Sequence, residues 1–279
     1  MADGKGRRVA ITGIGALTPI GITRDAMWRG LREQRSAVRP VTRFDATDYR
    51  SKIAAEIDFH APDFLEEKRV KRLDRYGQFT VACSRLAVED SGLKLEAEDR
   101  ERIGAMMGSA LGGVGFAEEQ FAVFMTEGIK NVSVNLSTNV FAGAASCNVA
   151  IEFGAQGPNS TNAMSCASGT MAIGEGFRQI RDGYADVMIS GGVESPLNKL
   201  CFGAFAIIRG QRPRTLEEAR FGRPSRSTSV RGTGRIGWET STASRPMRRS
   251  QFTTSCGFAT LPLSMRSCVD GGASAIASS

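Results

Sequence analysis

The chain has 279 residues and a formal net charge of +7, with 41% hydrophobic and 23% charged residues, as is typical of globular proteins. It contains no run of about 18 apolar residues, so we expect no membrane-spanning helix. The N-terminus lacks the apolar core of a secretory signal, and we therefore expect a cytoplasmic protein.

Hydrophobic periodicity and turn signals predict strands that alternate with helices over the first 208 residues. Such alternation indicates parallel pairing in a layered α/β domain. The continuous apolar character of 187–190 suits a sheet that is covered on both faces. In chain order, we expect a strand at 9–12, a helix at 23–37, a strand at 52–57, a helix at 68–92, a strand at 102–108, a turn and helix at 109–125, a helix at 139–154, a strand at 159–166, a helix at 167–183 and a strand at 185–194.

Two of these helices carry recognisable end signals. Thr23 is expected to cap the first helix, because its hydroxyl can accept a hydrogen bond from a free backbone N–H group. In that helix, Ala26, Trp28 and Leu31 are expected to face partly inward. The longest helix is expected to end at Gly92, since glycine tolerates the left-handed conformation of a helix C-cap.

Two glycine clusters could be mistaken for nucleotide-binding loops. The segment GIGALT (13–18) follows a strand, but Thr18 stands where a dinucleotide fingerprint has its third glycine, and Pro19 follows. We interpret it as a turn. The segment GSALGGVG (108–115) lacks the lysine and hydroxyl residue of a phosphate-binding loop.

The basic charge is concentrated in the last quarter of the chain. Residues 209–279 contain twelve arginines, four acidic residues and no lysine, a net charge of +8, whereas residues 1–208 contain 24 basic and 25 acidic residues. The segment 209–279 is rich in Arg, Ser and Gly and shows no sustained helical or strand period, so we expect a tail of low order.

The six cysteines have no CxxC spacing, and the sequence has one histidine, His60. We therefore expect free thiols, no disulfide framework and no metal site. Cys83, Cys147 and Cys201 lie among apolar residues and are expected to pack in the core.

Cys166 differs from the other cysteines in its setting. In NAMSCASGT (162–170) it lies between small residues, where a predicted strand gives way to a helix. At the start of a helix, the macrodipole and free N–H groups favour a thiolate and can stabilise an oxyanion. A small, buried core cysteine would give the same local pattern, and both interpretations stay open at this level.

Several long segments in the same order make residues 7–208 resemble the N-terminal half of the β-ketoacyl-(acyl carrier protein) synthases of the KAS I/II type. The matching segments are RRVAITGIGALTPIG, RLDRYGQFTVACSRLAVEDSGL, GSALGGVG, IEFGAQGPNSTNAMSCASGTMAIGEGFRQIRDGYADVMISGGVESP and FGAFAIIR. The resemblance implies a thiolase-like layered domain over 1–208, followed by an unrelated tail over 209–279.

The resemblance also implies a chemistry. Cys166 matches the family's nucleophile, which accepts an acyl chain from the phosphopantetheine thioester of acyl carrier protein, and its N–H group would supply one oxyanion donor. Decarboxylative condensation with a malonyl-carrier protein follows. Leu111 and the gating Phe205 match positions that line the acyl pocket, although both could be plain core residues. The family forms homodimers through this half and uses no cofactor beyond phosphopantetheine.

The chain departs from the family in its second part. The two active-site histidines, the lysine and the Gly-Phe-Gly stretch of the family are absent, and His60 falls in a surface connection. We therefore expect a truncated chain, impaired in condensation, with a tail read out of frame. Without a second half, the apolar side chains Met171, Ile173 and Phe177 are expected to face water.

Three functions remain open on this basis. The first is a truncated condensing enzyme of fatty-acid synthesis. The second is a non-catalytic relic or polyketide-type subunit that binds acyl carrier protein. The third is nucleic-acid binding through the arginine-rich tail. The tail has few aromatic residues for base stacking and no recognised motif, so we expect no nucleic-acid partner.

Overall fold

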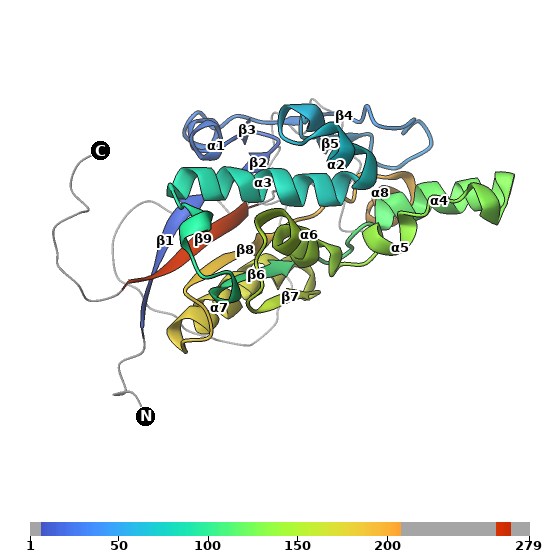
Figure 1. The fold of residues 1–279 in the computed structure, drawn as a ribbon. Helices are drawn as coiled ribbons and strands as arrows, with labels where there is room; N and C mark the ends of the chain where they lie inside the picture. The colour runs from blue at the N-terminus through green and yellow to red at the C-terminus, as the bar shows by residue number, and fades with distance from the viewer. Residues whose placement is uncertain (1–6, 208–260, 269–279) are drawn as a thin grey trace, which may run out of the picture.

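A five-stranded mixed sheet forms the centre of the computed structural model, which describes residues 7–207 and 261–268 (Figure 1). Strands β7, β6 and β8 run parallel, whereas β9 is antiparallel to both of its neighbours, β8 and β1. The parallel pairing expected from the alternating pattern is confirmed. In spatial order, the strands are β1 (Arg8–Ile14), β9 (Leu261–Cys268), β8 (Val187–Gly192), β6 (Ile103–Gly108) and β7 (Asn159–Asn162).

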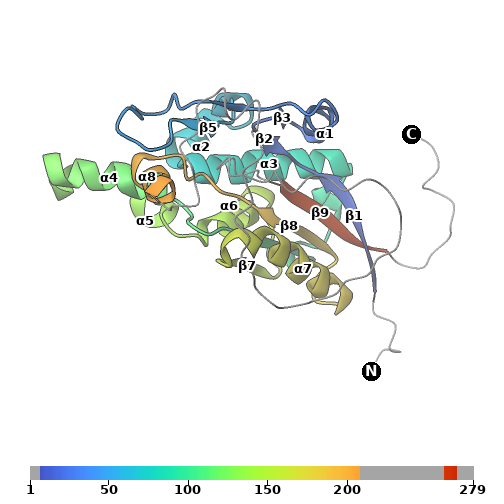
Figure 2. The same ribbon diagram turned by 180° about the vertical axis from the view of Figure 1, so that it is seen from behind.

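Helices cover both faces of this sheet. Helices α3 (Arg75–Ser91) and α6 (Ala144–Phe153) pack on one face, and α7 (Ser168–Arg181) packs on the other, as Figures 1 and 2 show from opposite sides. The other elements are β2 (Leu17–Thr18), β3 (Gly21–Ile22), α1 (Arg24–Arg32), β4 (Val38–Pro40), β5 (Ile53–Ala55), η1 (Ala61–Asp63), α2 (Glu67–Arg72), η2 (Leu95–Ala97), η3 (Arg100–Arg102), α4 (Val114–Glu127), η4 (Ile129–Asn131), α5 (Leu136–Asn139), η5 (Ser165–Ala167) and α8 (Lys199–Ile207).

Side chains of the central strands alternate between two hydrophobic cores. Val187 and Ile189 of β8 lie in the core with α3 and α6, whereas Met188 lies in a second core with Ile180 of α7. Because successive side chains of a strand point to opposite faces, a strand covered on both sides is apolar throughout. This is the reason for the continuous apolar runs in the sequence.

Strand β9 corrects the prediction of low order for residues 261–268 of the tail. Leu261–Cys268 lies between β1 and β8 and pairs with both. Its pairing satisfies backbone groups on two strand edges that would otherwise face each other unpaired. Met265 is 2% exposed and lies in the core beneath α7. The other residues of the predicted tail, 209–260 and 269–279, lie outside the described residues.

The long helix predicted over 68–92 is divided into α2 and α3. Leu73 is extended at the end of α2, and Asp74 caps α3 by accepting a hydrogen bond from the Gly77 N–H group at 2.8 Å. The expected end at Gly92 is confirmed by its left-handed φ of 64°. Hydrophobic periodicity continues through the break, because α2 and α3 both place apolar side chains in the same core region.

The capping carboxyl of Asp74 predicts a pH dependence of stability. Burial raises its pKa from 3.8 to about 6. The folded chain therefore binds a proton that the unfolded chain releases between these values. The stability from this group is present below about pH 4 and is lost as the pH rises to about 6, by at most about 3 kcal/mol.

Asp74→Asn is expected to remove this dependence, because asparagine caps helices without titrating. Urea unfolding from pH 4 to pH 7 measures it. The free energy of unfolding of the variant should rise relative to that of the wild type as the pH increases. Parallel profiles for the two chains would contradict the role of Asp74.

Several local expectations about exposure have clear outcomes. The Thr23 cap is confirmed by the 3.3 Å hydrogen bond from the Ala26 N–H group. The partly inward placement is confirmed for Ala26, which is half-buried, and wrong for Trp28 and Leu31, whose side chains are exposed. Helix α1 instead turns Gly30 inward, where a Cβ atom would lie 2.6 Å from the Ile20 carbonyl oxygen. This close approach leaves no room for a large side chain on the inner face.

Two of the three expected core cysteines are confirmed. Cys83 and Cys201 are buried, but Cys147 is exposed, so its predicted core position is wrong. Cys147 lies on α6, whose neighbours Ser146 and Asn148 are buried instead. The helix is rich in small residues on all sides, so its sequence does not distinguish the buried face.

The glycines of the segment 13–18 allow close packing. A Cβ atom at Gly13 would lie 2.7 Å from the Ser91 nitrogen, and one at Gly15 would lie 2.9 Å from the Ala87 nitrogen. The first strand thus lies directly against α3. The predicted turn lies later than expected: residues 13–14 belong to β1 and 17–18 to β2, and the turn of the hairpin of β2 and β3 lies at 19–20.

Candidate active site

Cys166 lies where the carboxyl ends of the parallel strands meet. The chain leaves β7 at Asn162, passes through the single turn η5 and enters α7 at Ser168. The Cys166 side chain is a free thiol on an exposed residue. In open α/β sheets, ligands bind outside the carboxyl ends of the strands, so the position suits a reactive group. The core interpretation of this cysteine is therefore not supported.

Asn162 holds both ends of the turn that contains Cys166. Its Oδ1 atom accepts a hydrogen bond from the Met164 N–H group at 3.3 Å, and its Nδ2 atom donates to the Ser168 carbonyl oxygen at 3.2 Å. Between them, Ser165 has a φ of 52°, in the left-handed region that a residue with a Cβ atom rarely adopts. Such strain persists only where surrounding contacts fix it, and it is common at functional sites.

The start of α7 is pressed against the sheet at glycines. A Cβ atom at Gly108, the last residue of β6, would overlap the Ser168 carbonyl and lie 2.7 Å from the Gly169 nitrogen. A Cβ atom at Gly192, the last residue of β8, would lie 2.9 Å from the Gly169 Cα atom. Only glycines permit this approach, which fixes where the helix begins relative to the strands.

The first turn of α7 has no hydrogen bond from a side-chain cap in the described structure. The Ala167 and Ser168 N–H groups donate within η5 to the Met164 and Ser165 carbonyl oxygens, and the positive end of the α7 dipole lies next to the Cys166 turn. This arrangement places a thiol where the helix dipole can stabilise negative charge on a bound carbonyl oxygen.

Leu111 lies in the loop 109–113 between β6 and α4 and is half-buried. The loop is tied to Glu194, which follows β8 and is 7% exposed. The carboxylate accepts hydrogen bonds from the Ala110 N–H group at 2.7 Å, the Leu111 N–H group at 3.3 Å and the Ser109 hydroxyl at 3.2 Å. Burial raises the pKa of Glu194.

The same loop is connected to the Cys166 turn. The Ser109 N–H group donates to the Asn162 carbonyl oxygen at 3.0 Å, and the Val193 N–H group donates to the Gly108 carbonyl oxygen at 3.0 Å. The structure therefore brings the segment that carries Leu111 next to the segment that leads to Cys166. Phe205 is half-buried on α8, which lies beside α4 at one end of the molecule (Figures 1 and 2).

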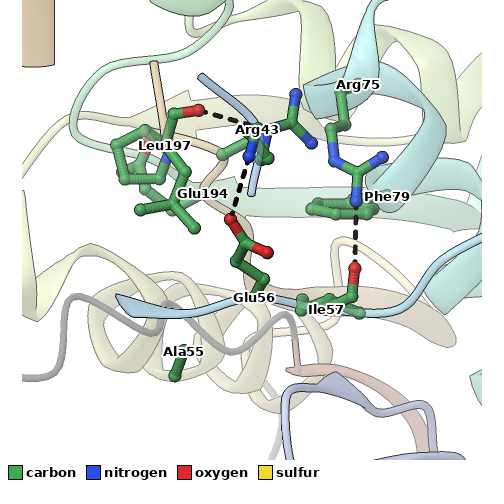
Figure 3. A pocket seen from close by; sticks show the side chains of 10 residues that line it. Arg43, Ala55, Glu56, Ile57, Arg75, Phe79, Glu194 and Leu197 are labelled. Atoms are coloured by element: carbon green, nitrogen blue, oxygen red, sulfur yellow. Dashed lines mark hydrogen bonds between the residues drawn. The ribbon is translucent and has the colours of Figure 1, made fainter. Parts of the chain in front are cut away.

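A small cavity lies behind the Glu194 segment (Figure 3). Its volume of about 30 Å³ is enough for one or two water molecules and too small for an acyl chain. Arg75 lines it, with its guanidinium 4.7 Å from the Phe79 ring centre and an Nη2 atom that donates to the Ile57 carbonyl oxygen at 3.1 Å. Burial lowers the pKa of Arg75 to about 10.

The single histidine lies in a surface segment, as expected. His60 is exposed, and its Nδ1 atom lies 2.9 Å from an Asp63 carboxylate oxygen. Within the described ranges, no three histidine, cysteine or acidic side chains gather as metal ligands would. No helix among the described residues is long and apolar enough to cross a membrane.

Two residues of the site, Asn162 and Glu194, were not predicted from the sequence. Each directly ends or follows a strand whose carboxyl end meets the others at one sheet edge, and this position is the signal that could have identified them. Asn162 is bonded to a residue 53 positions away and Glu194 to residues 83 to 85 positions away, and local sequence patterns do not reveal such long-range hydrogen bonds.

The comparisons with known proteins agree on the origin of the fold. The family model described as "Beta-ketoacyl synthase, N-terminal domain" matches residues 6–235. A 3-oxoacyl-[acyl-carrier-protein] synthase 2 from Synechocystis sp. is 39% identical over 210 residues, which cover 75% of this chain and 50% of that protein. The chain thus spans about half the length of the curated relatives that it matches.

Solved structures show the same architecture. The ishigamide ketosynthase/chain length factor has a TM-score of 0.71 at 25% identity, over 94% of this chain and 59% of that one. A type II PKS acyl-carrier protein in complex with its ketosynthase, bound to the hexaketide, gives a TM-score of 0.62 at 21% identity, over 74% and 55% of the two chains. These likenesses confirm the thiolase-like α/β fold expected for the N-terminal part.

Proposed function

The chain belongs to the β-ketoacyl synthase family, and from this membership we propose that Cys166 accepts an acyl group in the synthesis of 3-oxoacyl-(acyl carrier protein). The donor is an acyl thioester on the phosphopantetheine arm of acyl carrier protein, and no other cofactor is used. The observation that carries the proposal is an exposed thiol, on a strained turn, at the uncapped start of α7.

The acyl transfer proceeds by attack of the Cys166 thiolate on the thioester carbonyl carbon. A bond forms between Sγ and this carbon while the carbonyl electron pair moves to oxygen. The N–H group of Cys166 and the start of α7 stabilise that oxyanion. When the carbonyl re-forms, the pantetheine sulfur leaves as a thiolate and takes up a proton. The covalent acyl-enzyme divides one difficult reaction into two easier steps.

The condensation step needs more donors than this chain offers. Loss of carbon dioxide from a malonyl thioester leaves an enolate, and its negative charge must be stabilised by hydrogen-bond donors. The sequence has one histidine, and His60 is exposed and paired with Asp63. We therefore propose that this chain is acylated at Cys166 but is impaired in condensation.

An acylation assay tests this function. The full chain is incubated with acyl carrier protein that bears a radiolabelled acyl group, and the label on the chain is located by peptide mapping. We expect label on Cys166 in the wild type, complete loss in Cys166→Ala, and full retention in Cys147→Ala. Cys147 is the matched control, because it is also a free thiol on an exposed residue. An unlabelled wild type, or a labelled Cys166→Ala chain, would refute the proposal.

The single histidine also favours a second candidate, a non-catalytic relic or polyketide-type subunit that binds acyl carrier protein. This function requires binding of the carrier protein without acylation. If Cys166 stays unlabelled while acyl carrier protein is retained on the immobilised chain, the second candidate is preferred. Free cysteines at the described positions fit the cytoplasm as its location for either function.

We further propose that two copies of the chain associate through this N-terminal part. The edge strand β7 supports this, because it pairs with β6 on one side only in the described sheet. An open strand edge is a template for pairing with another chain. The nearby α4–α6 region adds exposed apolar side chains, among them Phe121, Phe141 and Ile151.

A further inference from the structure

Glu194 is a buried acid whose hydrogen-bond partners all come from one neighbouring loop. Its two carboxylate oxygens accept from three consecutive residues, 109–111, as described above. The Ser109 hydroxyl in turn accepts a hydrogen bond from the Gly112 N–H group at 3.0 Å. Hydrogen bonds to a charged acceptor are stronger than those between neutral groups, so this carboxylate determines the shape of the loop.

The loop cannot move independently of the Cys166 turn. The Ser109 N–H group donates a hydrogen bond to the Asn162 carbonyl oxygen. The Asn162 side chain accepts from the Met164 N–H group and donates to the Ser168 carbonyl oxygen, on either side of Cys166. A continuous series of hydrogen bonds therefore runs from Glu194 through Ser109 and Asn162 to the two residues that flank the Cys166 turn, Met164 and Ser168. Leu111 projects from the part of the loop that Glu194 holds directly.

We propose that Glu194 is a positioning residue that holds Leu111 at a fixed place relative to Cys166 and so sets which acyl-chain lengths Cys166 accepts. The selectivity part of this inference rests on the proposed function, whereas the anchoring of the loop does not. Glu194 itself takes no part in the covalent step. The acyl chain is selected by the room that Leu111 leaves beside the thiol.

The test uses the full-length chain and the variant Glu194→Gln, with Glu89→Gln as the matched control on the exposed end of α3. Glutamine keeps the size of the side chain but replaces one acceptor oxygen by an N–H donor. Hydrogen exchange of the segment 109–113 is expected to become about tenfold to hundredfold faster in Glu194→Gln and to stay unchanged in Glu89→Gln.

Acyl selectivity is the second readout. Substitution of a residue that only stabilises the fold would not change it. The rates of Cys166 acylation by a short and a long saturated acyl thioester of pantetheine are compared. The ratio of the two rates is expected to change by roughly tenfold in Glu194→Gln, because a displaced Leu111 alters the fit of the acyl chain and not the reactivity of the thiol. Alkylation of Cys166 by iodoacetamide needs no pocket, so it measures separately any change in the thiol itself, which the ratio of the two acyl rates cancels.

Each result has one meaning. If hydrogen exchange at 109–113 is unchanged in Glu194→Gln, Glu194 does not hold the loop. If exchange is faster but the ratio of the two acylation rates is unchanged, Glu194 does not set the acyl-chain selectivity. If Glu194→Gln does not fold, the same two measurements are made on Ser109→Ala, which removes one hydrogen-bond donor to Glu194 and keeps the carboxylate. The exchange rate and the ratio of acylation rates are then expected to change in the same direction, but by less. A wild-type chain that is never acylated refutes the proposed function and, with it, the proposed selectivity. The exchange data still test whether Glu194 holds the loop.

Discussion

Met265→Ala is expected to lower the free energy of unfolding by about 2 to 5 kcal/mol, the range for truncation of a buried methionine. Met265 is the residue of β9 that lies in the core beneath α7, with Met106, Ile180 and Met188 around it. Its methyl group also fills the space beside Gly176, where a Cβ atom would lie 2.8 Å from it. Loss of these contacts leaves a cavity that the helix and the sheet cannot close.

The size of this effect follows from the place of β9 in the sheet. In register, Met265 lies opposite Ile11 of β1 and Met188 of β8, so it lies at the junction of the two. Among the described strands, β1 pairs with β9 alone. Weakening β9 therefore separates the first strand of the chain from the rest of the sheet.

Met125→Ala is the matched control, because Met125 is an exposed methionine on α4. Its substitution is expected to change the stability by less than about 0.5 kcal/mol. Urea unfolding of the two variants and the wild type measures both effects. Equal stabilities for Met265→Ala and Met125→Ala would mean that β9 does not occupy this position in solution.

The same strand shows where prediction from the sequence ends. The strands β6 and β8 were predicted because both faces are buried and their sequences are apolar throughout. Leu261–Cys268 is not apolar throughout and contains Pro262, which disfavours a central strand, and it becomes a strand because two existing edges pair with it. Strand formation depends on cross-strand partners more than on intrinsic preference.

Other differences have the same origin. The break between α2 and α3 depends on Asp74, whose capping bond to Gly77 outweighs a hydrophobic period that runs on without interruption. Trp28 and Leu31 were predicted to face inward from helical spacing, but the close approach of Gly30 to Ile20 decides which side of α1 is covered. The spacing of apolar residues identifies a helix, but the segments that pack against it determine which face is buried.

For the candidate site, the sequence predicted the position of Cys166 better than the contacts that support it. The change from strand to helix at 162–170 was enough to place Cys166 at a turn before a helix. The roles of Asn162 and Glu194 depend on segments that meet only after folding. Local patterns therefore place the proposed nucleophile at a turn before a helix, while the contacts that hold this turn are found only in the structure.

Gly108→Ala is expected to cost about 3 kcal/mol of stability and to reduce acylation of Cys166 strongly. The new methyl group would overlap the Ser168 carbonyl and lie 2.7 Å from the Gly169 nitrogen. Both obstacles are backbone atoms, so no side-chain rotation relieves them, and overpacking of this kind is among the more costly core changes.

The strand cannot retreat to make room. Gly108 is paired with Asn162 of β7 on one side and with Gly192 of β8 on the other. The strain must therefore be relieved by a shift of the start of α7. Such a shift breaks the hydrogen bond from Asn162 to the Ser168 carbonyl, and the turn that presents Cys166 loses one of its two supports.

Gly174→Ala provides the control within the same helix. A Cβ atom there meets no other atom within 4 Å, and alanine in a helix is favoured over glycine by up to about 1 kcal/mol. Urea unfolding should show a loss of stability for Gly108→Ala and a small gain for Gly174→Ala, and the acylation assay should show a loss of labelling for the first alone. If both variants keep wild-type labelling, contact between β6 and α7 does not position Cys166, because the site would then tolerate displacement of the helix that follows it.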